Sequence, residues 1–244
     1  MDRLDAQVRF YEILAELEEN LGGKKRLADC DGRMGWPKRG VYFFFEDGEE
    51  RTDSGMGQRV VRVGTHALSD GSKATLWNRL SQHRGSGSTY TGNHRGSIFR
   101  LLIGAAIKNR ESLAELGSWG ISSDPAKAAQ KLGLTRSQVK EQEHDLEVTV
   151  SKHIRSMGFL WVAVDDPPGP TSSRGVIERN SIGLLSNYRY EPLDPPSSGW
   201  LGRHSDRERV QHSGVWNNRH VEEGYEPEFL ELLASFGEDT PPLS

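Results

Sequence analysis

The chain of 244 residues contains only one cysteine, Cys30, which excludes an internal disulfide and a cysteine-rich zinc site. No apolar run approaches the roughly 18 residues that a membrane-spanning helix requires. The first residues lack the basic region and the small-residue cleavage site of a signal peptide. From these absences we expect a cytoplasmic protein with no membrane partner.

Acidic residues are missing from positions 71–110, although the whole chain has a net charge of −4. The basic residues of this block are Lys73, Arg79, Arg84, Arg95, Arg100, Lys108 and Arg110. A block of one sign can attract a phosphate backbone even when the total charge is negative. It can equally be a surface patch that acidic residues from elsewhere in the chain balance in space. Composition leaves both interpretations open.

Several motifs with known chemistry are also absent. The sequence has no HExxH or CxxC metal motif, no GxSxG nucleophile elbow, no Walker loop and no GxGxxG. These absences argue against the common zinc hydrolases, serine hydrolases and nucleotide-binding folds.

The apolar pattern predicts a mixed α+β chain without repeats. The expected elements are a helix over 5–20, a strand from Gly40 that ends at the turn signal "EDGEE", a strand over 58–68, helices over 75–84 and 98–109, a strand over 159–166 and a helix from about Ser173. A polar loop joins the first two strands, which favours an antiparallel hairpin. Thr75 is the expected cap of the helix that follows them.

Two features carry candidate chemistry. Arg79 and His83 are four residues apart on a predicted helix, so their side chains share a face. A guanidinium can bind a phosphate and an imidazole can move a proton, although a solvated helix face is the more frequent explanation of such a pair. Glu178, early in a later helix, can likewise be a metal ligand or a partner of the helix dipole.

The order of these residues resembles the GIY-YIG endonuclease superfamily. Gly40-Val41-Tyr42 lies on a first strand, Arg62-Val63-Gly64-Thr65 on a second, Arg79-x-x-x-His83 on a helix, and Glu178 on a helix after a third strand. The Arg-x-x-x-His pattern is most similar to the branch that contains type II restriction endonucleases. The resemblance covers residues 38–107 and 158–190.

This resemblance implies one decorated domain over residues 1–244. Its core would be a small antiparallel three-stranded sheet flanked by helices. An N-terminal helix, a helical insertion over 108–157 and a C-terminal extension over 191–236 would surround the core.

The implied activity is hydrolysis of DNA phosphodiester bonds. Tyr42 would be the general base, Arg79 would hold the phosphate, and His83 would assist either Tyr42 or the phosphate. Glu178 would bind one Mg²⁺, for which Mn²⁺ could substitute. A homodimer is expected for a restriction-type enzyme, because one such site cuts one strand. The alternatives are a repair or mobile-element nuclease, or an inactive nucleic-acid-binding module of the same fold.

Two positions fit the family pattern less simply. Arg62 replaces the first tyrosine of the second motif, and we expect it to take over part of the catalytic role, because a positive charge near Tyr42 favours the phenolate form. Asn187 matches a phosphate-contacting asparagine of the family, and a helix cap is the alternative. Nine residues of continuous helix would put Asn187 opposite Glu178, so it reaches the site only if the helix ends or bends, with Gly183 the expected place.

Further DNA contacts are expected from basic residues around the core, namely Lys73, Arg84, Arg95, Arg100 and Arg203. For Trp200 and Trp216 in the C-terminal extension, packing onto the core is the favoured interpretation over stacking on bases.

Overall fold

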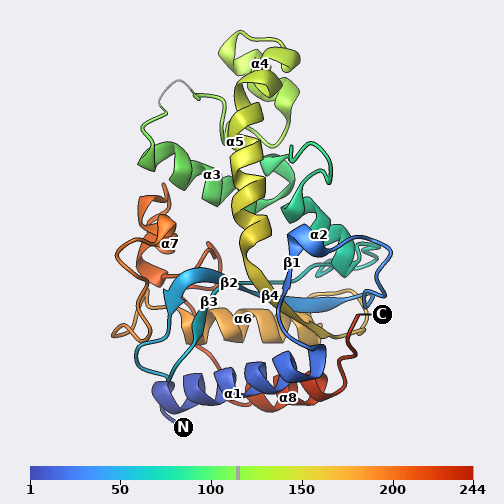
Figure 1. Cartoon of the computed structure of the whole chain (residues 1–244), viewed down its shortest axis with the longest axis vertical. Helices are drawn as coiled ribbons and strands as arrows, with labels where there is room; N and C mark the ends of the chain where they lie inside the picture. The colour runs from blue at the N-terminus through green and yellow to red at the C-terminus, as the bar shows by residue number, and fades with distance from the viewer. Residues whose placement is uncertain (114–115, 244) are drawn as a thin grey trace.

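The computed structural model describes residues 1–113 and 116–243 and contains an antiparallel sheet flanked by helices (Figure 1). Its four strands, in the spatial order β1-β4-β2-β3, are β1 (Lys25–Arg26), β2 (Gly40–Glu50), β3 (Gln58–Gly64) and β4 (Gly158–Ala163). The α+β class is confirmed, and β2 and β3 form the expected hairpin. The expected number of three strands is wrong, because β1 pairs with β4 and two residues are too short to show a strand pattern.

Eight α-helices and three short 3₁₀ segments complete the described chain. The helices are α1 (Arg3–Leu21), α2 (Leu76–Arg84), α3 (Ile98–Arg110), α4 (Pro125–Leu132), α5 (Arg136–Ser156), α6 (Ser173–Leu185), α7 (Glu208–Ser213) and α8 (Phe229–Glu238). The 3₁₀ segments are η1 (Leu27–Asp29), η2 (His94–Gly96) and η3 (Leu201–His204). Within the described ranges, no helix has both the length and the apolar character that crossing a membrane requires.

Local capping signals set where the functional helix begins. The Thr75 hydroxyl accepts a hydrogen bond from the Asn78 amide, and the Asn78 side chain bonds back to the Thr75 backbone. This reciprocal capping box satisfies two amides that the first turn of α2 leaves unpaired. Thr75 is therefore confirmed as the cap, and α2 starts in the register that the sequence pattern predicts.

The two faces of the sheet carry different chemistry. Phe43 points to the face covered by α1, α6 and α8, where its ring lies 5.8 Å from that of Phe10 (Figure 1). Tyr42 and Phe44 alternate to the opposite face, as successive strand residues must. There the Phe44 ring lies 5.3 Å from Phe99 at the start of α3. The face with α2 and α3 is the one that carries the tyrosine of the first motif.

The C-terminal extension packs onto the sheet. Trp200 and Trp216 are buried, their ring centroids are 5.1 Å apart, and both indole N–H groups donate to Glu46 on β2. Packing of the two tryptophans is thus confirmed. Two indoles buried with satisfied N–H groups bury a large apolar area, so the extension is part of the folded core.

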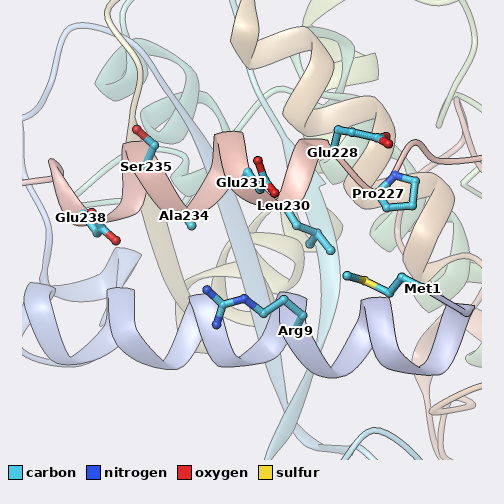
Figure 2. Close-up of a pocket in the computed structure, with 9 residues that line it drawn as sticks. All are labelled: Met1, Arg9, Pro227, Glu228, Leu230, Glu231, Ala234, Ser235 and Glu238. Carbon is cyan, nitrogen blue, oxygen red and sulfur yellow. The ribbon is translucent and has the colours of Figure 1, made fainter.

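A groove of about 650 Å³ lies between α1 and α8 (Figure 2). Arg9 enters it from α1, and three acidic side chains of the opposite wall, Glu228, Glu231 and Glu238, border it. None of the residues with candidate chemistry borders this groove. The groove is therefore separate from the predicted site residues.

Candidate active site

A cavity of about 540 Å³ opens where β3 ends. Its polar lining comes from Arg62 on β3, Thr65 and His66 just after it, Arg79 on α2, Arg95 on η2, Ser97 at the start of α3, Glu178 on α6, and 217–220 in the C-terminal extension. The cavity thus brings together three of the predicted catalytic residues, Arg62, Arg79 and Glu178, from three separate elements, and it also includes Arg95 from the predicted DNA contacts. Glu178 is the one carboxylate that borders it among the described residues.

Tyr42 and His83 form a buried pair beside this cavity. The Tyr42 hydroxyl is 2.8 Å from His83 Nε2, and His83 Nδ1 is 2.7 Å from the Ser97 hydroxyl. Burial, and then the nearby charge of Arg79, hold the pKa of His83 well below its ordinary value. His83 is therefore a neutral imidazole, and one ring nitrogen can accept a hydrogen bond from the Tyr42 hydroxyl while the other is held by Ser97.

Arg79 and His83 occupy different environments although they are one helical turn apart. His83 is fully buried, continues the apolar stripe of Leu76 and Leu80, and does not border the cavity. Arg79 is half-buried and borders the cavity, with its guanidinium bonded to the Gly96 carbonyl at 3.2 Å. His83 was expected to assist either Tyr42 or the phosphate. It contacts Tyr42 and does not border the cavity.

Arg62 lies on the same face of the sheet as Tyr42. Phe44 is its direct partner across the hairpin and Tyr42 is its diagonal neighbour. The guanidinium donates to the Trp216 carbonyl and lies 5.4 Å from the centre of the Phe99 ring. Burial lowers the pKa of Arg62, while the proximity of Tyr42 and Glu178 acts in the opposite direction. A largely buried cation therefore lies close to both Tyr42 and the cavity's carboxylate.

Gly64 is the residue that makes room for the Tyr42 phenol. A Cβ atom added to Gly64 would lie 2.4 Å from the Tyr42 hydroxyl oxygen and 2.5 Å from the ring carbon that bears it. Atoms that close cannot coexist, so any larger residue at position 64 must displace the ring.

Gly64→Ala is therefore expected to displace the Tyr42 hydroxyl from His83 and to destabilise the fold by about 1–3 kcal/mol through overpacking. Urea unfolding measures the loss of stability, and the fluorescence and near-ultraviolet dichroism of the core aromatics report the displaced ring. Gly96→Ala is the matched control, because a Cβ atom there has no atom within 4 Å. Equal stability of the two variants would contradict the close approach.

Glu178 combines burial with an open path to the cavity. Its Oε1 accepts a hydrogen bond from the Thr65 amide at 3.2 Å. Burial raises the pKa of the Glu178 carboxyl, and Arg62, His220 and the Thr65 amide act in the opposite direction. The second carboxylate oxygen has no hydrogen-bond partner among the described residues, so it can bind a ligand in the cavity.

The donor set around Glu178 fits a hard divalent cation. No group of three or more His, Cys, Asp or Glu side chains in the described chain could hold a metal ion. Zinc usually takes three or four such ligands, whereas Mg²⁺ keeps several waters and binds through one or two carboxylates together with substrate phosphates. A single carboxylate facing a cavity lined by arginines matches the second pattern.

A family model for the GIY-YIG domain matches residues 1–242. The chain belongs to the GIY-YIG family. The match includes the N-terminal helix, the helical insertion and the C-terminal extension, which the motif resemblance left out. A comparison with curated proteins found no match, and neither did one with solved structures. Because the GIY-YIG domain is a nuclease domain, the chain has a nuclease-type hydrolase fold.

Asn187 lies away from the site of this GIY-YIG domain. Helix α6 continues through Gly183 to Leu185, and Asn187 follows its end. The Asn187 side chain accepts from Arg3 at 2.9 Å and pairs with both backbone groups of Leu193. Its amide is occupied in joining the extension to α1, so the structure does not support a phosphate contact.

The predicted DNA-contacting residues divide into buried and exposed ones. Arg100 is fully buried and its Nε donates to Glu147 on α5 at 3.1 Å, so it cannot reach DNA. Arg95 forms a bidentate pair with Glu143, which also lies on α5, at 2.7 and 2.8 Å. Two of the seven basic residues of the acid-free block are thus balanced in space by acidic residues of α5.

The remaining three basic residues are accessible to different extents. Lys73 is exposed and makes no ion pair within the described chain. Arg84 is half-buried, and its Nε donates to the Leu27 carbonyl at 2.9 Å. Arg203 is exposed but bonds to two backbone carbonyls of its own extension. These three remain candidates for contact with DNA.

The sequence analysis missed several residues that border the cavity. His66 is buried beside Arg79, and neither of its ring nitrogens has a hydrogen-bond partner among the described residues. The sequence pointed to His66 only through its position directly after the second motif. His220 and its neighbours come from the C-terminal extension, 42 positions after Glu178, where spacing gives no indication.

The buried histidines of the site make the GIY-YIG domain sensitive to acid. Burial, together with the charge of Arg174, lowers the pKa of His66 to about 4, from an ordinary value near 6.5. Between these values the unfolded chain binds a proton that the folded chain does not, so stability must fall as the pH falls from about 6.5 toward 4.

When the pH falls from 7 to 4, the wild type is expected to lose roughly 2 kcal/mol more stability than His66→Gln. This figure includes an allowance for screening by solvent. Urea unfolding of both proteins at several pH values measures this. His83 retains its own acid sensitivity in the variant, so the slope should decrease without vanishing. Parallel stability curves for the two proteins would show that folding does not lower the pKa of His66.

Proposed function

We propose that the protein is a metal-dependent endonuclease that hydrolyses the phosphodiester bonds of duplex DNA. The observation that carries the proposal is the convergence of Arg62, Arg79 and Glu178 on one cavity, with the Tyr42–His83 pair directly behind it. Hydrolysis of a phosphodiester needs a base for the attacking water and positive charge at the transition state. The cavity and its surroundings provide groups suited to both requirements.

The arginines bind the substrate in this mechanism. Arg79, half-buried at the cavity, would bind a non-bridging oxygen of the scissile phosphate through its planar guanidinium. Arg62 would contact a second oxygen. Tyr42 is fully buried and does not border the cavity, whereas Arg62 does. We therefore expect the Arg62 side chain to move toward the phosphate and to open a path for water to the Tyr42 hydroxyl.

Proton transfer would involve Tyr42 and His83. The attacking water gives a proton to the Tyr42 oxygen, from which the phenol proton passes to His83 Nε2, 2.8 Å away. The water oxygen bonds to phosphorus as the bond to the 3′ oxygen breaks, and the 3′ oxygen then takes a proton from solvent to become a hydroxyl. A divalent metal ion at Glu178 supplies positive charge for the leaving oxygen when it is bound.

The biological role proposed is that of a type II restriction-type enzyme. The Arg79-x-x-x-His83 pattern supports this branch, and a homodimer would place one site on each DNA strand. A repair or mobile-element nuclease would use the same site on a different substrate. Digestion of many DNA sequences distinguishes them, because a restriction enzyme cuts at one short sequence.

Plasmid nicking tests the proposed activity. Wild-type protein with Mg²⁺ is expected to convert supercoiled plasmid to nicked or linear forms, and Glu178→Ala is expected to leave it intact. An inactive nucleic-acid-binding module is the rival function, which the complete burial of Tyr42 favours. Tight DNA binding by the wild type without nicking, on plasmids of varied sequence and methylation, would establish that rival.

A further inference from the structure

His220 reaches the cavity from a segment that pairs with the open edge of the sheet. The Trp216 amide donates to the Val61 carbonyl at 2.6 Å. The Asn217 side chain accepts from the Val63 amide at 3.2 Å and donates to its carbonyl at 2.9 Å, as a neighbouring strand would. These bonds hold the chain three residues before His220, so its position follows from pairing with β3.

The imidazole of His220 is oriented by a carboxylate. His220 Nδ1 is 2.8 Å from Glu223 Oε1, and the other oxygen of Glu223 lies 3.2 Å from Arg179 Nε. A neutral imidazole that donates from Nδ1 carries its lone pair on Nε2. In the described part of the chain no hydrogen bond uses Nε2, which leaves it free for a ligand.

His220 and Glu178 face the same space. Both border the cavity of about 540 Å³, and both border a second cavity of about 620 Å³ beside it. An imidazole nitrogen and a carboxylate oxygen are therefore presented together at the junction of two cavities.

We propose that His220 is a second protein ligand, beside Glu178, of the divalent metal ion, and that Glu223 is the residue that positions its ring. The inference rests on the proposed metal dependence at Glu178. Metal-bound histidines almost always donate their other ring N–H to a carboxylate, a backbone carbonyl or water, which fixes the tautomer and the ring orientation. The Glu223–His220 pair has this arrangement before any metal binds.

A nitrogen ligand changes which metal the site prefers. Mg²⁺ binds almost entirely through oxygen, whereas first-row transition ions also accept imidazole. Glu178 and His220 together should therefore bind Mn²⁺ more tightly than Mg²⁺. A site built on Glu178 alone would show little of this preference.

Mn²⁺ is the probe that tests the inference without any measurement of cleavage. Full-length protein is titrated with Mn²⁺, free Mn²⁺ is counted by electron paramagnetic resonance, and pulsed resonance detects nitrogen bound to the ion. We expect one site with nitrogen coupling in the wild type. His220→Gln should lose that coupling and bind Mn²⁺ about tenfold or more weakly, and Glu223→Gln should bind it about 10–100-fold more weakly.

His212→Gln is the matched control. His212 on α7 also faces a glutamate, with Nδ1 3.6 Å from Glu208, but it is exposed and does not border either cavity. This variant should keep both the affinity and the coupling of the wild type, and circular dichroism should show all variants folded. The inference would be overturned if the wild type showed no nitrogen coupling. It would also be overturned if His220→Gln kept the coupling or bound Mn²⁺ as tightly as the wild type.

The nicking assay separates this inference from the proposed function. Nicking by wild type with no nitrogen coupling would refute His220 as a ligand and leave the nuclease intact. Nitrogen-coupled Mn²⁺ with no cleavage of any DNA would confirm the ligand and refute the nuclease.

Discussion

Tyr42→Phe is expected to lower the rate of DNA nicking by about 10²–10⁴-fold, the usual contribution of a general base. The phenylalanine ring fills the same space above Gly64, so the sheet face should keep its packing. Only the hydroxyl is lost, and with it the 2.8 Å contact to His83 Nε2. The structural cost should be about 1 kcal/mol, because one buried polar atom loses its partner. Single-turnover nicking and urea unfolding of the same preparation measure the two effects.

Tyr11→Phe is the matched control for this variant. Tyr11 on α1 is also a buried tyrosine whose hydroxyl has one protein partner, the Val60 amide at 3.0 Å, and it lies on the opposite face of the sheet. Its loss should cost similar stability and leave nicking unchanged. Equal rates for Tyr42→Phe and the wild type would exclude Tyr42 as the base, and equal losses in both variants would reduce its role to folding.

Arg100→Met is expected to destabilise the fold by about 3–5 kcal/mol, because it leaves a buried carboxylate without its main cation. Arg100 is fully buried, bonds to Glu147 through two guanidinium nitrogens and donates to the His83 carbonyl at 2.9 Å. Burial raises the pKa of Glu147, but the hydrogen bond with His94 Nδ1 at 2.9 Å, and then the pairing with Arg100, bring it below its ordinary value. Removing Arg100 should therefore loosen α2, α3 and α5 together.

Arg110→Met provides the comparison for the buried pair. Arg110 pairs with Glu111 on the surface, and such exposed pairs contribute about 0–1 kcal/mol. The double variant Arg100→Met with Glu147→Gln should recover part of the loss, since no unpaired charge remains. If Arg100→Met weakened DNA binding with no loss of stability in urea, the original expectation of a DNA contact would be correct after all.

The parts of the fold that sequence could predict are those with local signals. The capping pattern at Thr75, the alternation around Tyr42 and the apolar spacing of α1 each act within a few residues, and each element lies where it was expected. The ordered motifs then placed Arg79, Glu178 and Arg62 at one cavity, because the family pattern records which strands and helices meet.

The parts that failed depend on contacts between distant positions. Arg100 seemed available to DNA because its acidic partner, Glu147, follows 47 residues later on α5. Arg95 borders the cavity, but nothing in the sequence indicated its pairing with Glu143, 48 residues later. Asn187 matched a motif, but it follows the end of α6, and its side chain bonds to Arg3 and Leu193 and not to the cavity. His220 gave no signal, since its relation to β3 arises from edge pairing that no periodicity records.

The chemistry of the cut ends tests the central claim most directly, which is that water attacks the phosphorus at this cavity and the 3′ oxygen leaves. Wild-type protein is incubated with Mg²⁺ and a labelled DNA duplex in water enriched in oxygen-18, and the ends of the cleaved strand are analysed by mass spectrometry. The account predicts a 3′ hydroxyl and a 5′ phosphate that carries one heavy oxygen. Ends with a 3′ phosphate, or a 5′ phosphate without the label, would contradict it.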